Sequence, residues 1–136
     1  MTHIFTYGSL MFERVWKEVV SGTYRHLPGT VSGFIRRSIL NEDYPAILPG
    51  PVDSTVVGVL YLDINSEDLS RLDDFEGSFY ERRIVQVMTD NNIFAAEAYV
   101  LKDSYHHIAT DKDWDPEKFE DQGINQFFGS YFGFDH

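Results

Sequence analysis

The sequence contains no cysteine. This absence excludes a disulfide framework, a thiol nucleophile and a zinc-thiolate site, and it fits a reducing compartment. The chain also lacks a run of about 20 apolar residues, which a membrane-spanning helix needs. Its N-terminus shows no basic region followed by a long apolar run and a small-residue cleavage site, as a secretory signal would. We therefore expect a cytoplasmic protein with no membrane partner.

Basic residues are scarce, with 11 Lys and Arg against 22 Asp and Glu and a net charge of -11. Nucleic-acid binding depends on basic side chains that neutralise phosphates, so this charge argues against DNA and RNA as partners. The acids are scattered along the chain, and we interpret them as favouring solubility rather than as a recognition surface. The G-x-G-x-x-G, P-loop and H-E-x-x-H motifs are absent too, which leaves dinucleotide, nucleotide and zinc-protease functions without support.

The adjacent histidines His106 and His107 lie near Asp103 and Asp111, a grouping that could suggest a metal site. On an extended segment, however, neighbouring side chains point to opposite faces and cannot easily share one ion. We predict a solvated loop at this place and no bound metal.

Aromatic residues are abundant, with 11 Phe, 8 Tyr and 2 Trp in 136 residues, 43% of which are hydrophobic. This length and composition are typical of one domain with one core, so we expect a single domain over residues 1–136. The sequence leaves open whether the protein is a monomer or a homodimer. We expect the aromatic segment FFGSYFGF, residues 127–134, to pack on the domain or at a subunit contact.

Short strands alternate with two or three helices along the chain. Helical spacing of apolar residues predicts a helix from about Phe12 to Val20. A second helix is predicted by Ser66 as its N-cap, by acids in its first turn and by Gly77 as its stop. Asp115 and Pro116 resemble the N-cap and first residue of another helix, with Phe119 turned to the core. The predicted strands are His3–Thr6, Thr55–Ile64, Arg82–Thr89 and Ile93–Leu101, with further short antiparallel strands between Gly22 and Pro51.

The stretch TYGSL, residues 6–10, lies between the first predicted strand and the first predicted helix. A glycine-containing turn at such a place exposes consecutive main-chain N–H groups, which bind anions or carbonyl oxygens. Gly8 would let a ligand approach the backbone, and Ser9 could donate its hydroxyl or cap the helix. The pattern leaves open whether the turn is a simple helix cap or part of a binding site. Since the G-x-S-x-G elbow is absent, Ser9 is not predicted to act as a nucleophile.

Three acids, Asp73, Asp74 and Glu76, lie at the predicted end of the second helix. The negative end of the helix and the like charges both oppose ionisation, so the pKa of each acid should rise, most for the one that is desolvated. We interpret Asp73 and Asp74 as solvated surface acids. The arginines available to pair with them are Arg71, Arg82 and Arg83. Glu76 follows the inward-facing Phe75 and could reach a cleft, and the pattern leaves open whether it is a surface acid or a base.

Five short stretches, taken in order, resemble one family. They are YGSL, YPAILPG, VGVLYLDI, LDDFEGSFYERRIVQV and AEAYV, which together extend over about residues 3–101. Their order and spacing resemble the γ-glutamylcyclotransferase-like superfamily, especially its γ-glutamylamine cyclotransferase-like branch. The resemblance implies an α+β fold, a small twisted mixed β-barrel with a few packed helices.

The same resemblance implies an activity. Such enzymes release 5-oxoproline and a free amine or amino acid when the α-amine of a γ-glutamyl donor attacks its own γ-carbonyl. By similarity Glu76 is the general base and acid, and the turn formed by Tyr7, Gly8, Ser9 and Leu10 holds the γ-glutamyl group through main-chain N–H groups. No metal or cofactor is required. The donor stays open between γ-glutamyl amino acids, γ-glutamyl amines, an ε-(γ-glutamyl)lysine isopeptide and a pathway-specific intermediate.

A fold of this kind can also persist without catalysis, because a fold alone does not establish turnover. The alternative function is therefore a non-catalytic module that binds a γ-glutamyl ligand or a protein.

Overall fold

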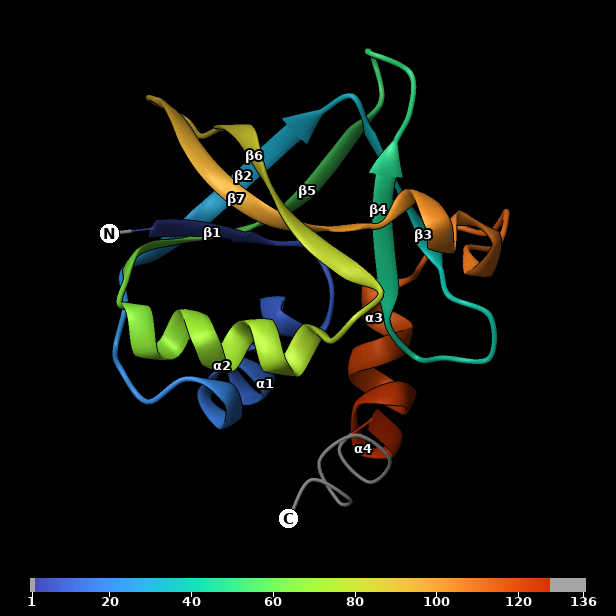
Figure 1. The fold of residues 1–136 in the computed structure, drawn as a ribbon, viewed down its shortest axis with the longest axis horizontal. Coiled ribbons are helices and arrows are strands. Elements are labelled where there is room, and N and C mark those ends of the chain that lie inside the picture. Colours follow the sequence, from blue (N-terminus) through green and yellow to red (C-terminus); the bar gives the residue numbers. More distant parts are fainter. Residues whose placement is uncertain (1, 128–136) are drawn as a thin grey trace.

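The computed structural model describes residues 2–127, in which five strands close a mixed β-barrel (Figure 1). The strands, in their order around the barrel, are β1 (Thr2–Thr6), β5 (Thr55–Ile64), β2 (His26–Ser32), β6 (Tyr80–Met88) and β7 (Ile93–Leu101). β1 is antiparallel to β5 and parallel to β7, and the pairing of β2 with β6 at Thr30 and Met88 closes the ring. The predicted α+β barrel is therefore confirmed.

Local sequence pattern fixes most strand limits. β5 and β7 have the predicted bounds, whereas β6 begins two residues before the predicted Arg82 and ends at Met88. The region between Gly22 and Pro51 supplies β2 and a separate hairpin of β3 (Phe34–Ser38) and β4 (Pro45–Pro49), as predicted. This hairpin lies beside the barrel in Figure 1 and carries Pro45 toward the turn after β1.

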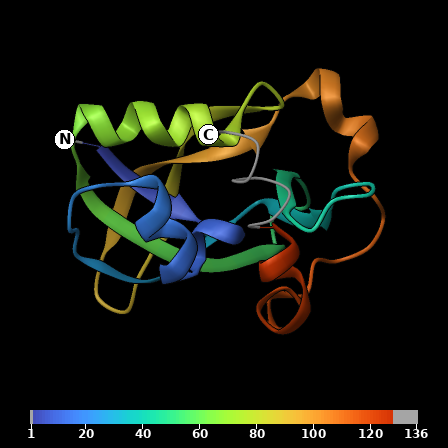
Figure 2. The same ribbon diagram turned by 90° about the horizontal axis from the view of Figure 1, so that it is seen from below.

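The two helices α1 (Glu13–Val19) and α2 (Ser66–Glu76) contact each other on one side of the barrel (Figures 1 and 2). A 3-10 turn, η1 (Ser9–Met11), precedes α1, whose caps are Phe12 and Val20, so the first α-helix agrees with the prediction to within one residue at each end. Ser66 is not the N-cap of α2. Asn65 takes that place, because its side chain accepts a 2.8 Å hydrogen bond from the Asp68 N–H. Gly77 ends the helix as predicted, with a φ of +81° that favours glycine.

The barrel has an inner and an outer core, which follow from the alternation of side chains along its strands. Ile4 packs in the outer core, between the barrel and the helices, and its neighbour Phe5 packs in the barrel interior. Leu72 of α2 and Trp16 of α1 belong to the outer core and are 0% and 4% exposed. The helices that carry the candidate site are thus fixed by burial against the barrel wall.

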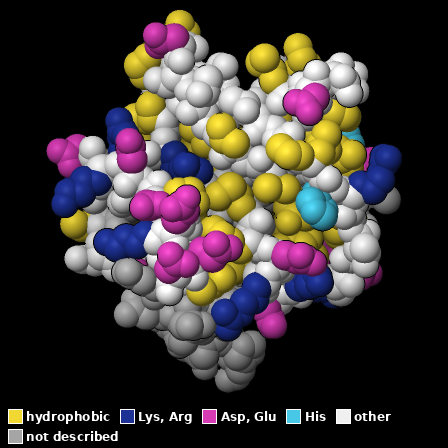
Figure 3. Space-filling model, turned by 180° about the vertical axis from the view of Figure 1, so that it is seen from behind, with side chains coloured by type: hydrophobic (Ala, Val, Ile, Leu, Met, Phe, Trp, Pro, Cys, Tyr) yellow, Lys and Arg dark blue, Asp and Glu magenta, His cyan; other side chains and the backbone are white. Residues whose placement is uncertain are grey.

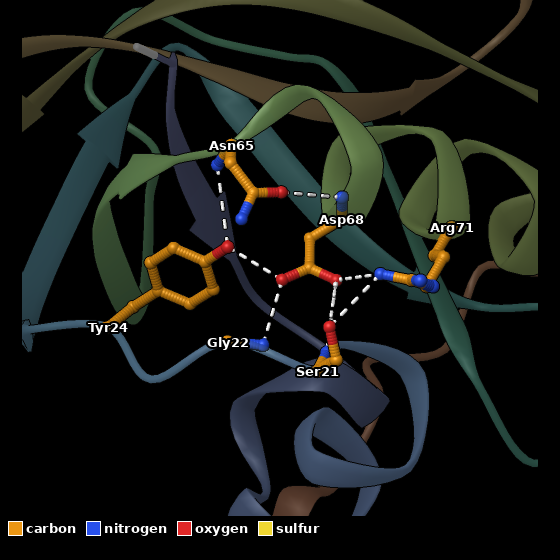
Figure 4. A network of polar contacts seen from close by, with 6 residues as sticks. All are labelled: Ser21, Gly22, Tyr24, Asn65, Asp68 and Arg71. Atoms are coloured by element: carbon orange, nitrogen blue, oxygen red, sulfur yellow. Dashed lines mark hydrogen bonds and ion pairs between the residues drawn. The ribbon is translucent and has the colours of Figure 1, made fainter.

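A buried carboxylate fastens α2 to the loop after α1 (Figure 4). Asp68 is fully buried, and the main-chain N–H groups of Ser21 and Gly22 each donate to it at 3.0 Å. The Tyr24 hydroxyl donates at 2.6 Å and Arg71 at 2.5 Å. Burial alone would raise the pKa of Asp68, but these hydrogen bonds outweigh it and hold the pKa well below its usual range.

The last part of the described chain covers the hairpin side of the barrel. The segment Asp103–Ile108 forms a 3-10 helix, η2, so the expectation of an extended or loop segment around His106 and His107 is wrong. Asp115 caps α3 (Pro116–Lys118) as predicted, by accepting a 3.0 Å hydrogen bond from the Glu117 N–H. A π-helical turn, η3 (Phe119–Gly123), and α4 (Ile124–Phe127) follow.

Phe119 is 3% exposed and reaches the core as predicted. Of the aromatic segment, Phe127 is buried in the outer core, and residues 128–134 lie outside the described residues. Over residues 2–127 no helix has the length and apolarity needed to cross a membrane. On the face seen in Figure 3, acidic and basic side chains lie among one another around hydrophobic ones.

Candidate active site

A small cavity lies where the turn after β1, the start of β4 and the end of α2 meet. Its volume is about 20 Å³, room for roughly one water molecule. The residues that line it are Tyr7, Ser9, Tyr44, Pro45, Phe75, Glu76, Tyr80 and Phe127. Two sites that are nearly 70 residues apart in the sequence, the TYGSL turn and Glu76, are therefore brought together.

Glu76 is the last residue of α2 and is half-buried in the cavity wall. Its carboxyl group has no hydrogen bond or ion pair with any residue of the part of the chain described here. Burial, and after it the negative charge of Asp73, raises the pKa of Glu76 to about 8. A carboxyl group that is partly removed from water, has no partner among the described residues and can titrate near neutral pH is suited to move protons.

Tyr7 is fixed at both its polar groups. Its hydroxyl donates a 2.6 Å hydrogen bond to the main-chain oxygen of Tyr99, and its own main-chain oxygen accepts one of 2.8 Å from Arg36. Burial, and after it the proximity of Glu76, raises the pKa of Tyr7 well above its usual value. The phenol is therefore a neutral donor at physiological pH, and its place in the cavity wall is fixed.

The turn after Tyr7 has two consecutive main-chain N–H groups with no acceptor among the described residues. The N–H groups of Met11 and Phe12 donate to the oxygens of Gly8 and Ser9, at 3.0 and 3.2 Å. The N–H groups of Ser9 and Leu10, which precede them, find no hydrogen-bond acceptor among residues 2–127. The Leu10 side chain is 3% exposed and packs in the outer core, so this residue can offer a ligand only its main chain.

Gly8 is required by a close approach and not by a left-handed backbone, since its φ is -131°. A Cβ atom at this position would lie 2.7 Å from Cγ and 2.8 Å from Cδ of Pro45. Pro45 itself is held by the hydroxyl of Tyr80, which donates to its main-chain oxygen at 2.9 Å. Gly8 therefore allows the β4 end of the hairpin to form one wall of the cavity.

Five lining residues were not singled out from the sequence as site residues. They are Tyr44, Pro45, Phe75, Tyr80 and Phe127. Tyr44 and Pro45 begin the YPAILPG stretch, and Tyr80 lies four residues after Glu76, beyond the turn at Gly77. Helical spacing does not connect Tyr80 with Glu76, because α2 ends at Glu76 and Tyr80 begins β6. Phe127 comes from a segment with no comparable motif.

The other two acids of α2 have different surroundings. Asp73 accepts hydrogen bonds from Arg82, at 2.9 Å to Nε and 3.2 Å to Nη2, which confirms the expected pairing with an arginine. It also accepts a 2.7 Å hydrogen bond from the Tyr99 hydroxyl, so it is more than a solvated surface acid. Asp74 is exposed, as predicted.

No group of three or more His, Asp or Glu side chains among the described residues could hold a metal ion. His106 lies 3.5 Å from Asp103, a contact of one acid with one histidine.

The closed mixed barrel, with the TYGSL turn facing a half-buried carboxyl group at the end of α2, defines a γ-glutamylcyclotransferase-like protein. A family model described as gamma-glutamyl cyclotransferase, AIG2-like, matches residues 4–116. The chain belongs to this family.

Relatives in Arabidopsis thaliana have similar sequences. The chain is 38% identical to AIG2-like protein D over 93 residues, which are 68% of this chain and 60% of the relative. It is 35% identical to AIG2-like protein C over 101 residues, which are 73% of this chain and 58% of that relative. The chain thus matches about six tenths of the length of these curated relatives.

Solved structures share the fold at lower sequence identity. A solution structure from Arabidopsis thaliana has a TM-score of 0.72 at 24% identity and covers 96% of this chain and 87% of its own. An AIG2-like protein from Mus musculus has a TM-score of 0.66 at 23% identity and covers 85% of this chain and 88% of its own. A protein named gamma-glutamyl cyclotransferase has a TM-score of 0.63 at 20% identity and covers 74% of this chain and 66% of its own.

Proposed function

We propose that this protein is a cyclotransferase that releases 5-oxoproline and an amine or amino acid from a γ-glutamyl donor, with Glu76 as general base and acid. The observation that carries the proposal is a carboxyl group with no partner among the described residues and a pKa of about 8, in a cavity walled by the TYGSL turn. Membership of the gamma-glutamyl cyclotransferase, AIG2-like family supports the same reaction class.

The pKa of Glu76 suits the first proton transfer. The α-ammonium group of the donor must lose a proton before its nitrogen can attack, and an ordinary α-amino group has a pKa of about 8. Since the pKa of Glu76 is also about 8, moving this proton to the carboxylate changes the free energy little. The arriving ammonium also favours the charged carboxylate, so the donor helps to create the base that it needs.

The remaining steps balance around the same carboxyl group. The α-nitrogen forms a bond to the γ-carbon, and Glu76 passes the first proton to the departing nitrogen as the bond from that nitrogen to the γ-carbon breaks. The carboxylate then takes the second proton from the α-nitrogen and passes it to the departing amine, which leaves as an ammonium ion, so Glu76 ends in the state in which it began. Because nucleophile and electrophile belong to one molecule, holding the donor in its cyclising conformation supplies much of the rate enhancement.

Negative charge develops on the γ-carbonyl oxygen during this reaction. In the proposal it is stabilised by the main-chain N–H groups of Ser9 and Leu10, which have no acceptor in the described part of the chain. A γ-glutamyl group is larger than the cavity of about 20 Å³, so its binding requires the aromatic side chains of the wall to shift. Four of the lining residues besides Tyr7 are aromatic, namely Tyr44, Phe75, Tyr80 and Phe127.

The test is release of 5-oxoproline from a panel of γ-glutamyl amino acids, γ-glutamyl amines and ε-(γ-glutamyl)lysine, with a chelator present. Mass spectrometry follows 5-oxoproline and the departing amine together. We expect turnover of at least one donor by the wild-type protein and by Asp74→Asn, but not by Glu76→Gln. Binding of donors by a folded wild-type protein, with no turnover across the panel, would instead favour the non-catalytic binding module.

A further inference from the structure

Tyr99 of β7 contacts two of the elements that form the cavity wall. Its hydroxyl donates to Asp73 Oδ1 at 2.7 Å, and its main-chain oxygen accepts from the Tyr7 hydroxyl at 2.6 Å. The side chain is 4% exposed and packs in the outer core, so these two groups are held in place by the barrel. One residue thus binds the last turns of α2 on one side and the turn after β1 on the other.

The partner of Tyr99 on α2 is itself fixed to the barrel. Arg82 lies directly across from Tyr99 in the register of β6 and β7, and it binds both carboxylate oxygens of Asp73. A third nitrogen of Arg82 donates to Glu97 at 3.2 Å. A bidentate arginine and a phenol on two neighbouring strands therefore present a fixed binding surface to Asp73.

Asp73 and Glu76 are three residues apart, so they lie on one face of α2 in adjacent turns. Glu76 has no hydrogen bond of its own to a described residue, and its orientation is therefore set by the helix that carries it. The helix ends immediately after Glu76, at Gly77. The N–H of Gly77 donates to the main-chain oxygen of Asp73 at 3.1 Å. Without an anchor at Asp73, this last turn would be free to fray.

We propose that Tyr99 is a positioning residue for Glu76, which it holds opposite Tyr7 by binding Asp73 through its hydroxyl and Tyr7 through its main-chain oxygen. This inference rests on the proposed function. It assigns the Asp73, Tyr99 and Arg82 group a role in the reaction and not only in folding. Misplacing a reacting group by about 1 Å can cost roughly 100-fold in rate, so loosening the end of α2 should lower kcat.

Tyr99→Phe isolates the hydroxyl. The variant keeps the buried ring, the main-chain oxygen that binds Tyr7 and the charge of Asp73. We expect kcat to fall by about 10- to 100-fold with little change in KM, while the pH at which activity is half-maximal stays in place. Tyr61→Phe is the matched control, because Tyr61 is a buried tyrosine of the same outer core whose hydroxyl has no hydrogen-bond partner in residues 2–127.

Asp73→Asn separates position from charge. Among the described residues, the titratable and charged groups that face Glu76 are Tyr7, Tyr44, Tyr80, Tyr99 and Asp73. Of these, Asp73 is the carboxylate, and its charge opposes ionisation of Glu76. Its removal should therefore move the half-maximal point of the pH profile to lower pH, in contrast to Tyr99→Phe. Asp74→Asn removes a charge from the same helix at an exposed position and should leave the profile unchanged.

Two measurements on the folded protein need no turnover. Hydrogen exchange of the last amides of α2, including that of Gly77, should be about tenfold faster in Tyr99→Phe than in wild type or Tyr61→Phe. Carboxyl ¹³C NMR should show the titration of Glu76 at lower pH in Asp73→Asn. If Tyr99→Phe and Tyr61→Phe have the same hydrogen-exchange rates at the end of α2 and the same kcat, Tyr99 does not position Glu76. If no donor is turned over, the proposed function fails, and the exchange result still decides whether Tyr99 holds the helix end.

Discussion

Arg36 donates a 2.8 Å hydrogen bond to the main-chain oxygen of Tyr7, the first residue of the turn that faces Glu76. In a trans peptide the C=O and the following N–H point in opposite directions, so the Gly8 N–H is directed away from Arg36. The guanidinium also lies over the ring of Trp114, 5.4 Å from its centroid. A residue of the β3–β4 hairpin therefore sets the orientation of the first peptide plane in the turn.

The first prediction concerns this contact. Arg36→Ala leaves the Tyr7 oxygen without its donor and removes packing on Trp114, so we expect a loss of about 1–3 kcal/mol of stability and weaker donor binding. Urea denaturation and KM measure the two effects. The control is Arg37→Ala, next along the same strand, because Arg37 pairs with Asp113, which is 84% exposed, and such pairs contribute less than about 1 kcal/mol. Equal losses in the two variants would contradict a special role of Arg36.

The second prediction is a pH dependence. The raised pKa of about 8 means that Glu76 is mostly protonated at neutral pH, whereas a base must be deprotonated. We expect kcat/KM, which reports the free enzyme, to rise as the pH is raised through about 8. Glu76→Gln should lower the rate by about 100- to 10,000-fold above pH 8 and by less at lower pH, where Glu76 is protonated in wild type, so this rise should be lost. If Glu76→Gln had a normal rate while Asp74→Asn or Asp73→Asn lost activity, the assignment of Glu76 as the catalytic carboxylate would be wrong.

The third prediction concerns the stability cost of that carboxyl group. Its folded pKa of about 8 exceeds the ordinary 4.5, so between these pH values the folded protein holds a proton that the unfolded chain releases. Stability from this group is therefore full below about pH 4.5 and declines as the pH rises toward 8. Glu76→Gln does not titrate, and we expect it to be more stable than wild type at pH 9, by roughly a few kcal/mol at most, and similar at pH 4.5. Urea unfolding at the two pH values measures the free energy of unfolding of both proteins. A wild type more stable than Glu76→Gln at pH 9 would contradict the prediction.

Local pattern predicted those parts of the fold that neighbours in sequence determine. β5 and β7 have their predicted bounds because alternating and β-branched residues mark them, and Gly77 ends α2 because its φ is positive. The parallel pairing of β1 with β7 is set by closure of the barrel and has no signature in either strand.

The same division holds for the candidate site. Glu76 and the TYGSL turn could be selected from helix ends and glycine placement, but the contact of Pro45 with Gly8 depends on how the hairpin docks. The sequence marks Asp68 only as one of the acids in the first turn of α2 and does not predict that it is buried. Its burial depends on a loop more than 40 residues earlier in the chain, and only the tertiary fold shows it.

The fourth prediction addresses Asp68. Asp68→Ala leaves the N–H groups of Ser21 and Gly22 and the charge of Arg71 without their acceptor, so we expect a loss of about 3–5 kcal/mol. Because the folded pKa of Asp68 is lowered, its stabilisation is present at neutral pH and is lost as the pH falls below about 4, the ordinary value for aspartate. Chemical denaturation from pH 7 to pH 3 measures both effects. Glu67→Ala, at an exposed neighbour, should have little effect at either pH.

The last prediction compares two neighbours in the turn. Gly8→Ala places a methyl group 2.7 Å from the Pro45 ring, and since Pro45 is held by Tyr80, the turn itself must move. We expect a loss of about 1–3 kcal/mol in stability and a marked fall in kcat/KM. Ser9→Ala keeps every main-chain donor, so it should lower activity without abolishing it. Urea denaturation and steady-state kinetics on the two variants measure these effects. If Ser9→Ala were inactive with its fold intact while Gly8→Ala matched wild type, the main-chain cradle would be wrong, and a side-chain role such as covalent catalysis by Ser9 would replace it.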